Sequence, residues 1–222
     1  ILALSSTKAD IRMKMFNADG SEGEMCGNGI RCLVGFAFDK NIVPRETHVI
    51  SVETLAGIKE VTPFFEGEHM TRAKVSMGRP IFRAKDIPVE IPGQDTVTAY
   101  PLEVDGYVFN IHCVSMGNPH AVAFIEQSVD DVPLQTLGPD IENHIFFPRK
   151  TNFEVVNILS RDHIKVRVWE RGSGQTLACG TGACAAAVIS QREGITNNPT
   201  TVSLPGGNLV VTLSKTGEVV LD

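Results

Sequence analysis

The chain has 222 residues, which is enough for one large domain or for two domains of about 100 residues each. Its hydrophobic content of 42% and its charged content of 21% are ordinary for a folded globular protein. A net charge of −6 without a basic block argues against a nucleic-acid partner, and no apolar run reaches the roughly 18–20 residues that cross a membrane.

The first third of the chain combines short predicted strands with one helix. Residues 48–76 are expected to form an antiparallel meander without a β-α-β unit, and the polar cluster 17–21 predicts a turn. Apolar residues recur at helical spacing over residues 30–38, which places Cys26 near the start of a helix. The predicted strands cover residues 1–4, 9–16, 48–52, 57–65 and 70–76.

A domain boundary is predicted at Gly78-Arg79-Pro80, which is followed by further prolines. We therefore expect one domain over residues 1–80 and a second over residues 81–222. Helical structure is predicted within residues 130–143 and over residues 179–190, with a loop over residues 170–177. The strands predicted in this part cover residues 96–104, 107–114, 121–125, 151–160, 163–169, 200–204, 209–213 and 218–221.

One pattern occurs once in each predicted domain. Cys26-Gly27-Asn28-Gly29 and Cys179-Gly180-Thr181-Gly182 each follow a strand and a polar loop, and each opens a helix. The repeat predicts a duplication in which two half-sites, each built around a thiol, face one another.

The start of a helix suits a reactive thiol. Its first N–H groups have no acceptor within the helix, and the helix dipole adds positive charge there, so the pKa of the thiol is expected to fall. The same N–H groups can hold a carboxylate. Two thiols on opposite faces of one carbon could remove a proton from one side and return it from the other, without a metal or a cofactor.

The other cysteines are predicted to be structural. Cys32, Cys113 and Cys184 fall in apolar runs and are expected to be small buried hydrophobic residues. The cysteine spacings do not match Cys-x₂-Cys metal pairs, so no metal site is predicted. An odd number of cysteines favours a reducing, cytoplasmic compartment.

Several polar residues outside the two patterns could bind a ligand. Glu170 could bind an amino group and Arg171 a carboxylate, although a solvated charge pair at a strand end is an equally good interpretation. His120 could assist an acid or base. Candidates for hydrogen bonds to a zwitterionic ligand are Asn17, Asn118 and Asn152, each of which could instead be a structural turn residue.

Four stretches resemble the signatures of the diaminopimelate epimerase family. Residues 16–32 resemble the first cysteine motif of the family, and residues 170–183 resemble the second. Ser115-Met116-Gly117-Asn118-Pro119-His120 and Thr151-Asn152 also match. These stretches are spread over almost the whole chain.

The resemblance implies an α+β fold of two pseudo-symmetric domains, each a curled, mostly antiparallel sheet around a central helix, with the active site in the cleft between them. It implies a homodimeric enzyme that interconverts LL- and meso-diaminopimelate without a cofactor, in lysine and peptidoglycan precursor biosynthesis. Cys26 and Cys179 would be the acid/base pair, supported by His120 and Glu170. The residues expected to bind substrate are Asn17, Gly27, Asn28, Asn118, Asn152, Glu170, Arg171, Gly180 and Thr181.

The chain departs from the family at its ends. The opening segment of the family, with a further substrate-binding asparagine, has no counterpart before Ile1, and the final strand, which returns to the first domain, has none after Asp222. We therefore expect the first domain to lack part of its sheet.

Three alternatives remain open. Proline racemases and hydroxyproline epimerases resemble this family in fold and in their two cysteines, but they typically have histidine where Asn28 stands. A thiol–disulfide redox role would use the same two thiols without a Cys-x-x-Cys pair. A non-catalytic binding module would not need both cysteines.

Overall fold

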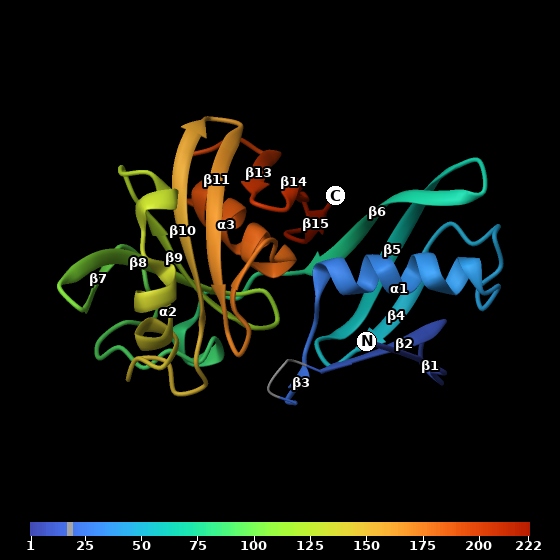
Figure 1. The fold of residues 1–222 in the computed structure, drawn as a ribbon, viewed down its shortest axis with the longest axis horizontal. Helices are drawn as coiled ribbons and strands as arrows, with labels where there is room; N and C mark the ends of the chain where they lie inside the picture. The colour runs from blue at the N-terminus through green and yellow to red at the C-terminus, as the bar shows by residue number, and fades with distance from the viewer. Residues whose placement is uncertain (17–19) are drawn as a thin grey trace.

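The computed structural model describes residues 1–16 and 20–222, and its first half wraps a short curled sheet around the helix α1 (Gly27–Asp39) (Figure 1). Ile30, Leu33, Val34, Ala37 and Phe38 form the buried face of α1, so the predicted helix is confirmed and extended at both ends. The strands of this half are β1 (Leu2–Leu4), β2 (Ile11–Phe16), β3 (Glu22–Gly23), β4 (Ile50–Thr54), β5 (Gly57–Glu66) and β6 (His69–Gly78).

The second half repeats this plan around α3 (Gly180–Arg192), with α2 (Leu134–Glu142) packed outside against β10, β11 and β12. Every residue from Gly180 to Ser190 is buried, because α3 lies inside its sheet and its alanines let the strands approach closely. The strands are β7 (Tyr100–Val104), β8 (Tyr107–Ser115), β9 (Pro119–Phe124), β10 (Asn152–Ser160), β11 (His163–Glu170), β12 (Gly174–Thr176), β13 (Thr200–Leu204), β14 (Gly207–Leu213) and β15 (Val219–Leu221). Two short 3₁₀ turns lie at Ala84–Asp86 and Val129–Asp131.

The two central helices are crossover connections between parallel strands. β2 pairs parallel with β4 across α1, and β11 pairs parallel with β13 across α3. The expected antiparallel meander over residues 48–76 is confirmed by β4, β5 and β6. The crossover through α1 precedes it, because parallel neighbours such as β2 and β4 need one. The remaining pairs are antiparallel except β9 with β10, so the predicted α+β class with mostly antiparallel sheets is confirmed.

Strand β15 joins the two halves. It pairs antiparallel with β14 on one edge and with β6 on the other, through Val75 and Ser76. The apolar residues 219–221 thus link the two halves, and the prediction that the family's final returning strand is missing after Asp222 stays a prediction. One hydrophobic cluster includes buried side chains of both halves, among them Val34 and Val188. The predicted division at residues 80 and 81 stays a prediction.

Two further predictions differ locally from the structure. Cys32 is exposed, because it lies on the face of α1 opposite the buried one, whereas Cys113 and Cys184 are buried as expected. The predicted loop 170–177 contains the short strand β12, which pairs with β11. Among the described residues, no helix is long and apolar enough to cross a membrane.

Candidate active site

Each Cys-Gly-x-Gly pattern caps a helix with its cysteine. Cys26 is the N-cap of α1, and its Sγ accepts a hydrogen bond from the N–H of Gly29 at 3.2 Å. Cys179 is the N-cap of α3, and its Sγ accepts from the N–H of Gly182 at 3.3 Å. The prediction that both thiols stand where a helix begins is therefore confirmed, with the same capping contact in both halves.

The two helix starts touch through the glycines that follow the cysteines. A Cβ placed on Gly27 would lie 3.1 Å from the Cα of Gly180, and one placed on Gly180 would lie 3.0 Å from the Cα of Gly27. Backbone therefore meets backbone with no room for a side chain. Figure 1 shows the starts of α1 and α3 meeting at the centre of the molecule.

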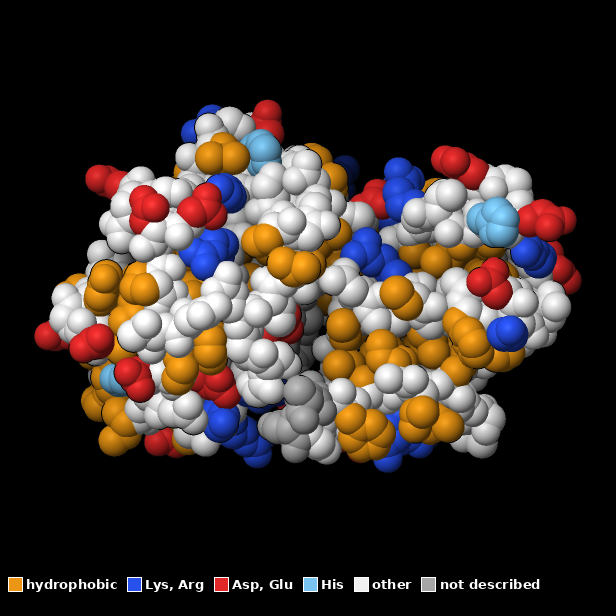
Figure 2. Space-filling view, in the orientation of Figure 1, with side chains coloured by type: hydrophobic (Ala, Val, Ile, Leu, Met, Phe, Trp, Pro, Cys, Tyr) orange, Lys and Arg blue, Asp and Glu red, His pale blue; other side chains and the backbone are white. Residues whose placement is uncertain are grey.

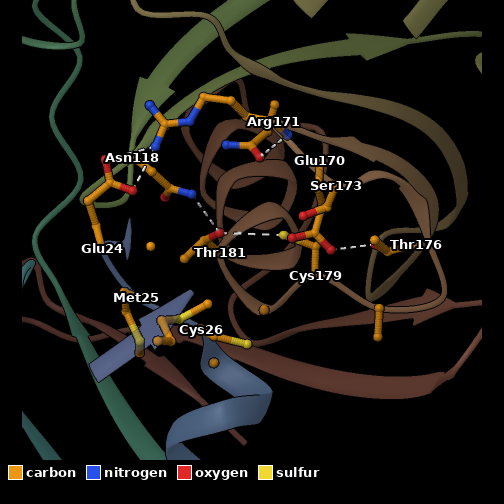
Figure 3. Close-up of a pocket in the computed structure, with 16 residues that line it drawn as sticks. Glu24, Met25, Cys26, Asn118, Glu170, Arg171, Ser173, Thr176, Cys179 and Thr181 are labelled. Carbon is orange, nitrogen blue, oxygen red and sulfur yellow. Dashed lines mark hydrogen bonds and ion pairs between the residues drawn. The ribbon is translucent and has the colours of Figure 1, made fainter. Parts of the chain in front are cut away.

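A cavity of about 180 Å³ lies beside this contact and is lined by both cysteines. Figure 2 shows the hollow between the two halves, and Figure 3 shows Cys26 and Cys179 on different sides of the pocket. The cavity is also lined by Gly27, Gly180 and Thr181, whose N–H groups lie in the first turn of a helix and have no partner within it. The site can thus hold an anion between two thiols.

The environment of Cys179 differs from the sequence-based prediction. Only 5% of this residue is exposed, and burial raises the pKa of its thiol well above the ordinary value, with the carboxylates of Glu170 and Glu154 adding to the rise. Hydrogen bonds from Thr181 and Gly182 act in the opposite direction but are outweighed. The expected fall in pKa is therefore wrong for Cys179, because desolvation exceeds the effect of the helix start.

Glu170 stands beside Cys179 at the end of β11. The hydroxyl of Thr176, on the paired strand β12, donates to Glu170 Oε1 (Figure 3). Both residues line the cavity. The β11–β12 hairpin thus holds one carboxylate in the pocket, close to the buried thiol.

Arg171 connects the two halves across the cavity. Its Nη2 lies 2.8 and 2.7 Å from the two carboxylate oxygens of Glu24, which stands just before the first cysteine. The backbone N–H of Arg171 donates to Asn152 Oδ1 at 3.0 Å, and Asn152 Nδ2 donates to the carbonyl of Pro119 at 2.7 Å. Asn152 therefore fixes the backbone on which Arg171 stands.

Asn118 lines the cavity near Arg171 and Glu24 (Figure 3). Its Nδ2 donates to Thr181 Oγ1 at 3.3 Å, and its Oδ1 lies 2.9 Å from His120 Nε2. Thr181 Oγ1 is in turn 3.4 Å from Cys179 Sγ. A line of polar groups thus leads from His120 to the buried thiol.

The comparisons with known proteins agree with this arrangement. The family model described as diaminopimelate epimerase matches residues 1–83 and 112–222. The chain is 49% identical to the diaminopimelate epimerase of Halothermothrix orenii over 212 residues, covering 94% of this chain and 73% of that protein. It is 46% identical over 211 residues to that of Acetivibrio thermocellus, covering 95% of this chain and 74% of that protein.

The chain belongs to the diaminopimelate epimerase family.

Its fold also resembles that of a more distant enzyme. The structure of a probable proline racemase from Agrobacterium radiobacter matches with a TM-score of 0.75 at 13% identity, covering 99% of this chain and 70% of that one. At this identity the likeness concerns the fold alone. It agrees with the two-domain α+β architecture of the diaminopimelate epimerase family.

Not every residue that the family resemblance suggested lines the cavity. His120 is fully buried behind Asn118 and does not reach it. Asn28 Oδ1 accepts a hydrogen bond from Arg31 Nη2, and Asn28 does not line the cavity. Asn17 lies outside the described residues. The other suggested residues, Asn118, Asn152, Glu170, Arg171, Gly27, Gly180 and Thr181, line the cavity together with both cysteines.

Sequence reasoning missed two carboxylates of the site. Glu24 pairs with Arg171 across 147 positions of sequence, and Glu154 lies 2.7 Å from His120 Nδ1 beneath α3. Neither had a signal in the sequence beyond its place next to a motif. Among the residues that the structure describes, no group of three or more His, Cys, Asp or Glu side chains could hold a metal ion.

Proposed function

We propose that this protein interconverts LL- and meso-diaminopimelate by a two-base mechanism that uses Cys26 and Cys179. The observation that carries the proposal is the single cavity lined by both thiols, at the place where Gly27 and Gly180 bring the two helix starts into contact. A racemising site of this kind needs one acid and one base on opposite faces of the same carbon. Family membership supports this substrate.

The proton transfer uses each sulfur once per turnover. One cysteine, as thiolate, removes the α-proton, and the electron pair of the broken C–H bond moves into the adjacent carboxylate. The other cysteine, as thiol, gives its proton to the opposite face of the carbon. The configuration of the α-carbon is inverted, and the two sulfurs end with exchanged protonation states.

The charge that develops on the carboxylate would be stabilised by the two helix starts. The N–H groups of Gly29 and Gly182 are used by the cysteine sulfurs. Those of Gly27, Asn28, Gly180 and Thr181 belong to the same first turns and would donate to the carboxylate oxygens. This stabilisation requires that both halves remain in contact.

We assign the role of resting acid to Cys179. Its thiol is buried, and two nearby carboxylates raise its pKa further, so it keeps its proton near neutral pH. Cys26, which is half-buried, is assigned the role of the base that takes the first proton.

The far end of the substrate would bind at Arg171. Its guanidinium already holds the carboxylate of Glu24, so it can hold the distal carboxylate of diaminopimelate in the same way. Glu170 and the side chains of Asn17, Asn118 and Asn152 are assigned to the amino groups and the far carboxylate. An amino acid that lacks a second amino and carboxylate group, such as proline, would leave this charged binding site around Arg171 unoccupied.

The biological setting follows from this assignment. We place the protein in the cytoplasm, in lysine and peptidoglycan precursor biosynthesis, which suits its five free cysteines. Cell fractionation tests the location, and recovery outside the cytoplasm would contradict it.

We also propose a homodimer. Figure 2 shows hydrophobic side chains gathered on the half that contains α1, where Ile1, Leu2 and Phe36 are exposed, and a second copy would cover them. Sedimentation velocity tests this, and a monomer at micromolar concentration would contradict it.

Proton NMR in D₂O tests the reaction itself. The purified protein should convert LL-diaminopimelate to the meso form with incorporation of deuterium at the α-carbon, and it should leave L-proline and trans-4-hydroxy-L-proline unchanged. Cys179→Ala is the control that should form no meso product, and Cys32→Ala is the active control, because Cys32 is exposed outside the cavity. Turnover of a proline substrate alone would overturn the proposed substrate.

A further inference from the structure

Glu154 begins a buried line of polar groups that ends at the sulfur of Cys179. Glu154 Oε1 lies 2.7 Å from His120 Nδ1, and His120 Nε2 lies 2.9 Å from Asn118 Oδ1. Asn118 Nδ2 donates to Thr181 Oγ1 at 3.3 Å, and Thr181 Oγ1 lies 3.4 Å from Cys179 Sγ. Figure 3 shows the last three residues of this line.

The orientation of the Asn118 amide gives the line a direction. Its Nδ2 donates to Thr181, so its oxygen faces His120 Nε2, and an amide oxygen can only accept. His120 Nε2 therefore carries a hydrogen. The hydroxyl of Thr181 already accepts from Asn118, so its own hydrogen is free to donate to Cys179 Sγ.

Glu154 is the group that fixes this direction. With a hydrogen on His120 Nε2, one more proton lies between His120 Nδ1 and Glu154 Oε1, and the pair is neutral as a whole. The opposite arrangement, with an ionised Glu154 and hydrogen on Nδ1 only, would leave a net negative charge at two residues that are both 0% exposed. Burial raises the pKa of Glu154, and its Oε2 has no hydrogen-bond partner among the described residues, so the neutral pair is favoured.

Gly182 provides the space for this carboxyl group. A Cβ on Gly182 would lie 2.7 Å from Glu154 Oε1, so any side chain there would displace Glu154 from beneath the first turn of α3. At the matching position of α1, a Cβ on Gly29 would meet the Cδ1 of Ile1 instead. The buried carboxyl therefore belongs to the Cys179 side of the site.

We propose that Glu154 is a positioning residue that, through His120, Asn118 and Thr181, aims a hydrogen-bond donor at Cys179 when its sulfur becomes a thiolate. This rests on the proposed function, in which Cys179 gives its proton to the substrate carbon. Without such donors, a sulfur this deeply buried and faced by the carboxylate of Glu170 on β11 would rarely carry a negative charge.

The test is the pH dependence of Cys179 alkylation by iodoacetamide, followed by peptide mass spectrometry in the absence of substrate. Only the thiolate reacts, so the midpoint of this profile reports how easily Cys179 ionises. Glu154→Leu removes the donor to His120 and should move the midpoint up by about one pH unit, the tenfold loss expected when a charged acceptor loses a hydrogen bond. Glu154→Gln should keep the midpoint, because its amide N–H can donate to His120 Nδ1 as a protonated carboxyl does.

A second pair of variants repeats the test at the other end of the line. Thr181→Val, which removes the hydroxyl with little change of shape, should raise the midpoint in the same way, and Thr181→Ser should preserve it. If Glu154→Leu does not fold, the two Thr181 variants still test whether the line delivers a hydrogen-bond donor to Cys179. Alkylation of Cys26 should change in none of the four variants, which separates a directed effect on Cys179 from general loosening.

Two results would overturn the inference. One is an unchanged Cys179 midpoint in the variants without the donor. The other is an equal shift in Glu154→Gln and Glu154→Leu, because the charge of Glu154 and not its direction of donation would then matter. Since no substrate is present, either result leaves the proposed epimerase activity untouched, and the activity assay can fail without affecting this measurement.

Discussion

Gly27 and Gly180 meet backbone to backbone, and the two helices that begin beside them carry the two cysteines of the site. An added Cβ at either glycine would lie 3.0 to 3.1 Å from the Cα of the other. Both cysteines cap these helices and line one cavity. We therefore expect the contact to set the width of the space in which one carbon can reach both thiols.

Gly180→Ala should reduce kcat/KM for diaminopimelate by roughly tenfold or more. The new methyl group meets backbone, so the halves must separate by a few tenths of an ångström, and two-sided proton transfer is sensitive to such changes. Gly35→Ala is the matched control in α1, because its Cβ would meet only the flexible Cε of Met70 at 3.3 Å. Steady-state kinetics decides, and full activity of Gly180→Ala would show that the contact does not set the geometry.

Cys26→Ala and Cys179→Ala should each lower epimerisation on the order of a thousandfold, because each removes one of the two acid/base groups. The remaining thiol can still remove a proton and return it on its own face. Each variant should therefore exchange the α-proton of one stereoisomer slowly with D₂O without inversion. Inversion and exchange are separated by NMR with a chiral derivative, with Cys32→Ala as the active control. Full epimerisation by either variant would contradict the two-base mechanism.

Glu24→Gln should lower KM for diaminopimelate and leave kcat nearly unchanged. The distal carboxylate has to displace Glu24 from Arg171, and the neutral amide would compete less well. The Glu24 and Arg171 side chains are 40% and 21% exposed, so solvent screening limits the effect to about 1 kcal/mol, or roughly fivefold in KM. Glu103→Gln, which changes an exposed carboxylate in β7, is the control for net charge. A higher KM in Glu24→Gln would show that Glu24 itself binds the substrate.

Stability should fall at alkaline pH because of the buried thiols. Burial raises the pKa of Cys184 to about 12 and also raises the pKa of Cys113 and Cys179. Unfolded thiols ionise near pH 8.5, so these groups stabilise the folded state fully below that pH and lose their contribution as the pH rises toward the folded values. Each thiol accounts for up to about 1.4 kcal/mol per pH unit in this window.

Urea unfolding at about pH 8 and about pH 10 measures this decrease in the free energy of unfolding. Cys113→Ala should make the decrease smaller by the contribution of one thiol. Cys113 lies in a hydrophobic cluster that also contains Leu102, Phe109 and Phe153, and it does not line the cavity. The buried Lys59, whose pKa is lowered by desolvation, acts in the opposite direction in both proteins and cancels in the comparison. Equal losses in the two proteins would show that Cys113 does not remain protonated in the folded state.

Local features of this protein could be predicted because they depend on few neighbouring residues. The helices that follow Cys26 and Cys179 are specified by apolar spacing and by a capping residue followed by glycine, and most strands by alternation over five to ten residues. The motifs around both cysteines also indicated the family. The sequence by itself thus determined which residues are candidates for the chemistry and that both cysteines stand where a helix begins.

Contacts between distant segments were decided only by the tertiary structure. The pairing of β15 with β6 and the packing of Gly27 against Gly180 place the two halves, and from this placement follows the Glu24–Arg171 pair. The line from Glu154 to Cys179 forms within the second half, from segments that are distant in sequence. The pKa of Cys179 follows too, because burial beneath neighbouring strands outweighs the local effect of a helix start. Desolvation and the meeting of remote side chains depend on how the whole chain packs, which no local pattern specifies.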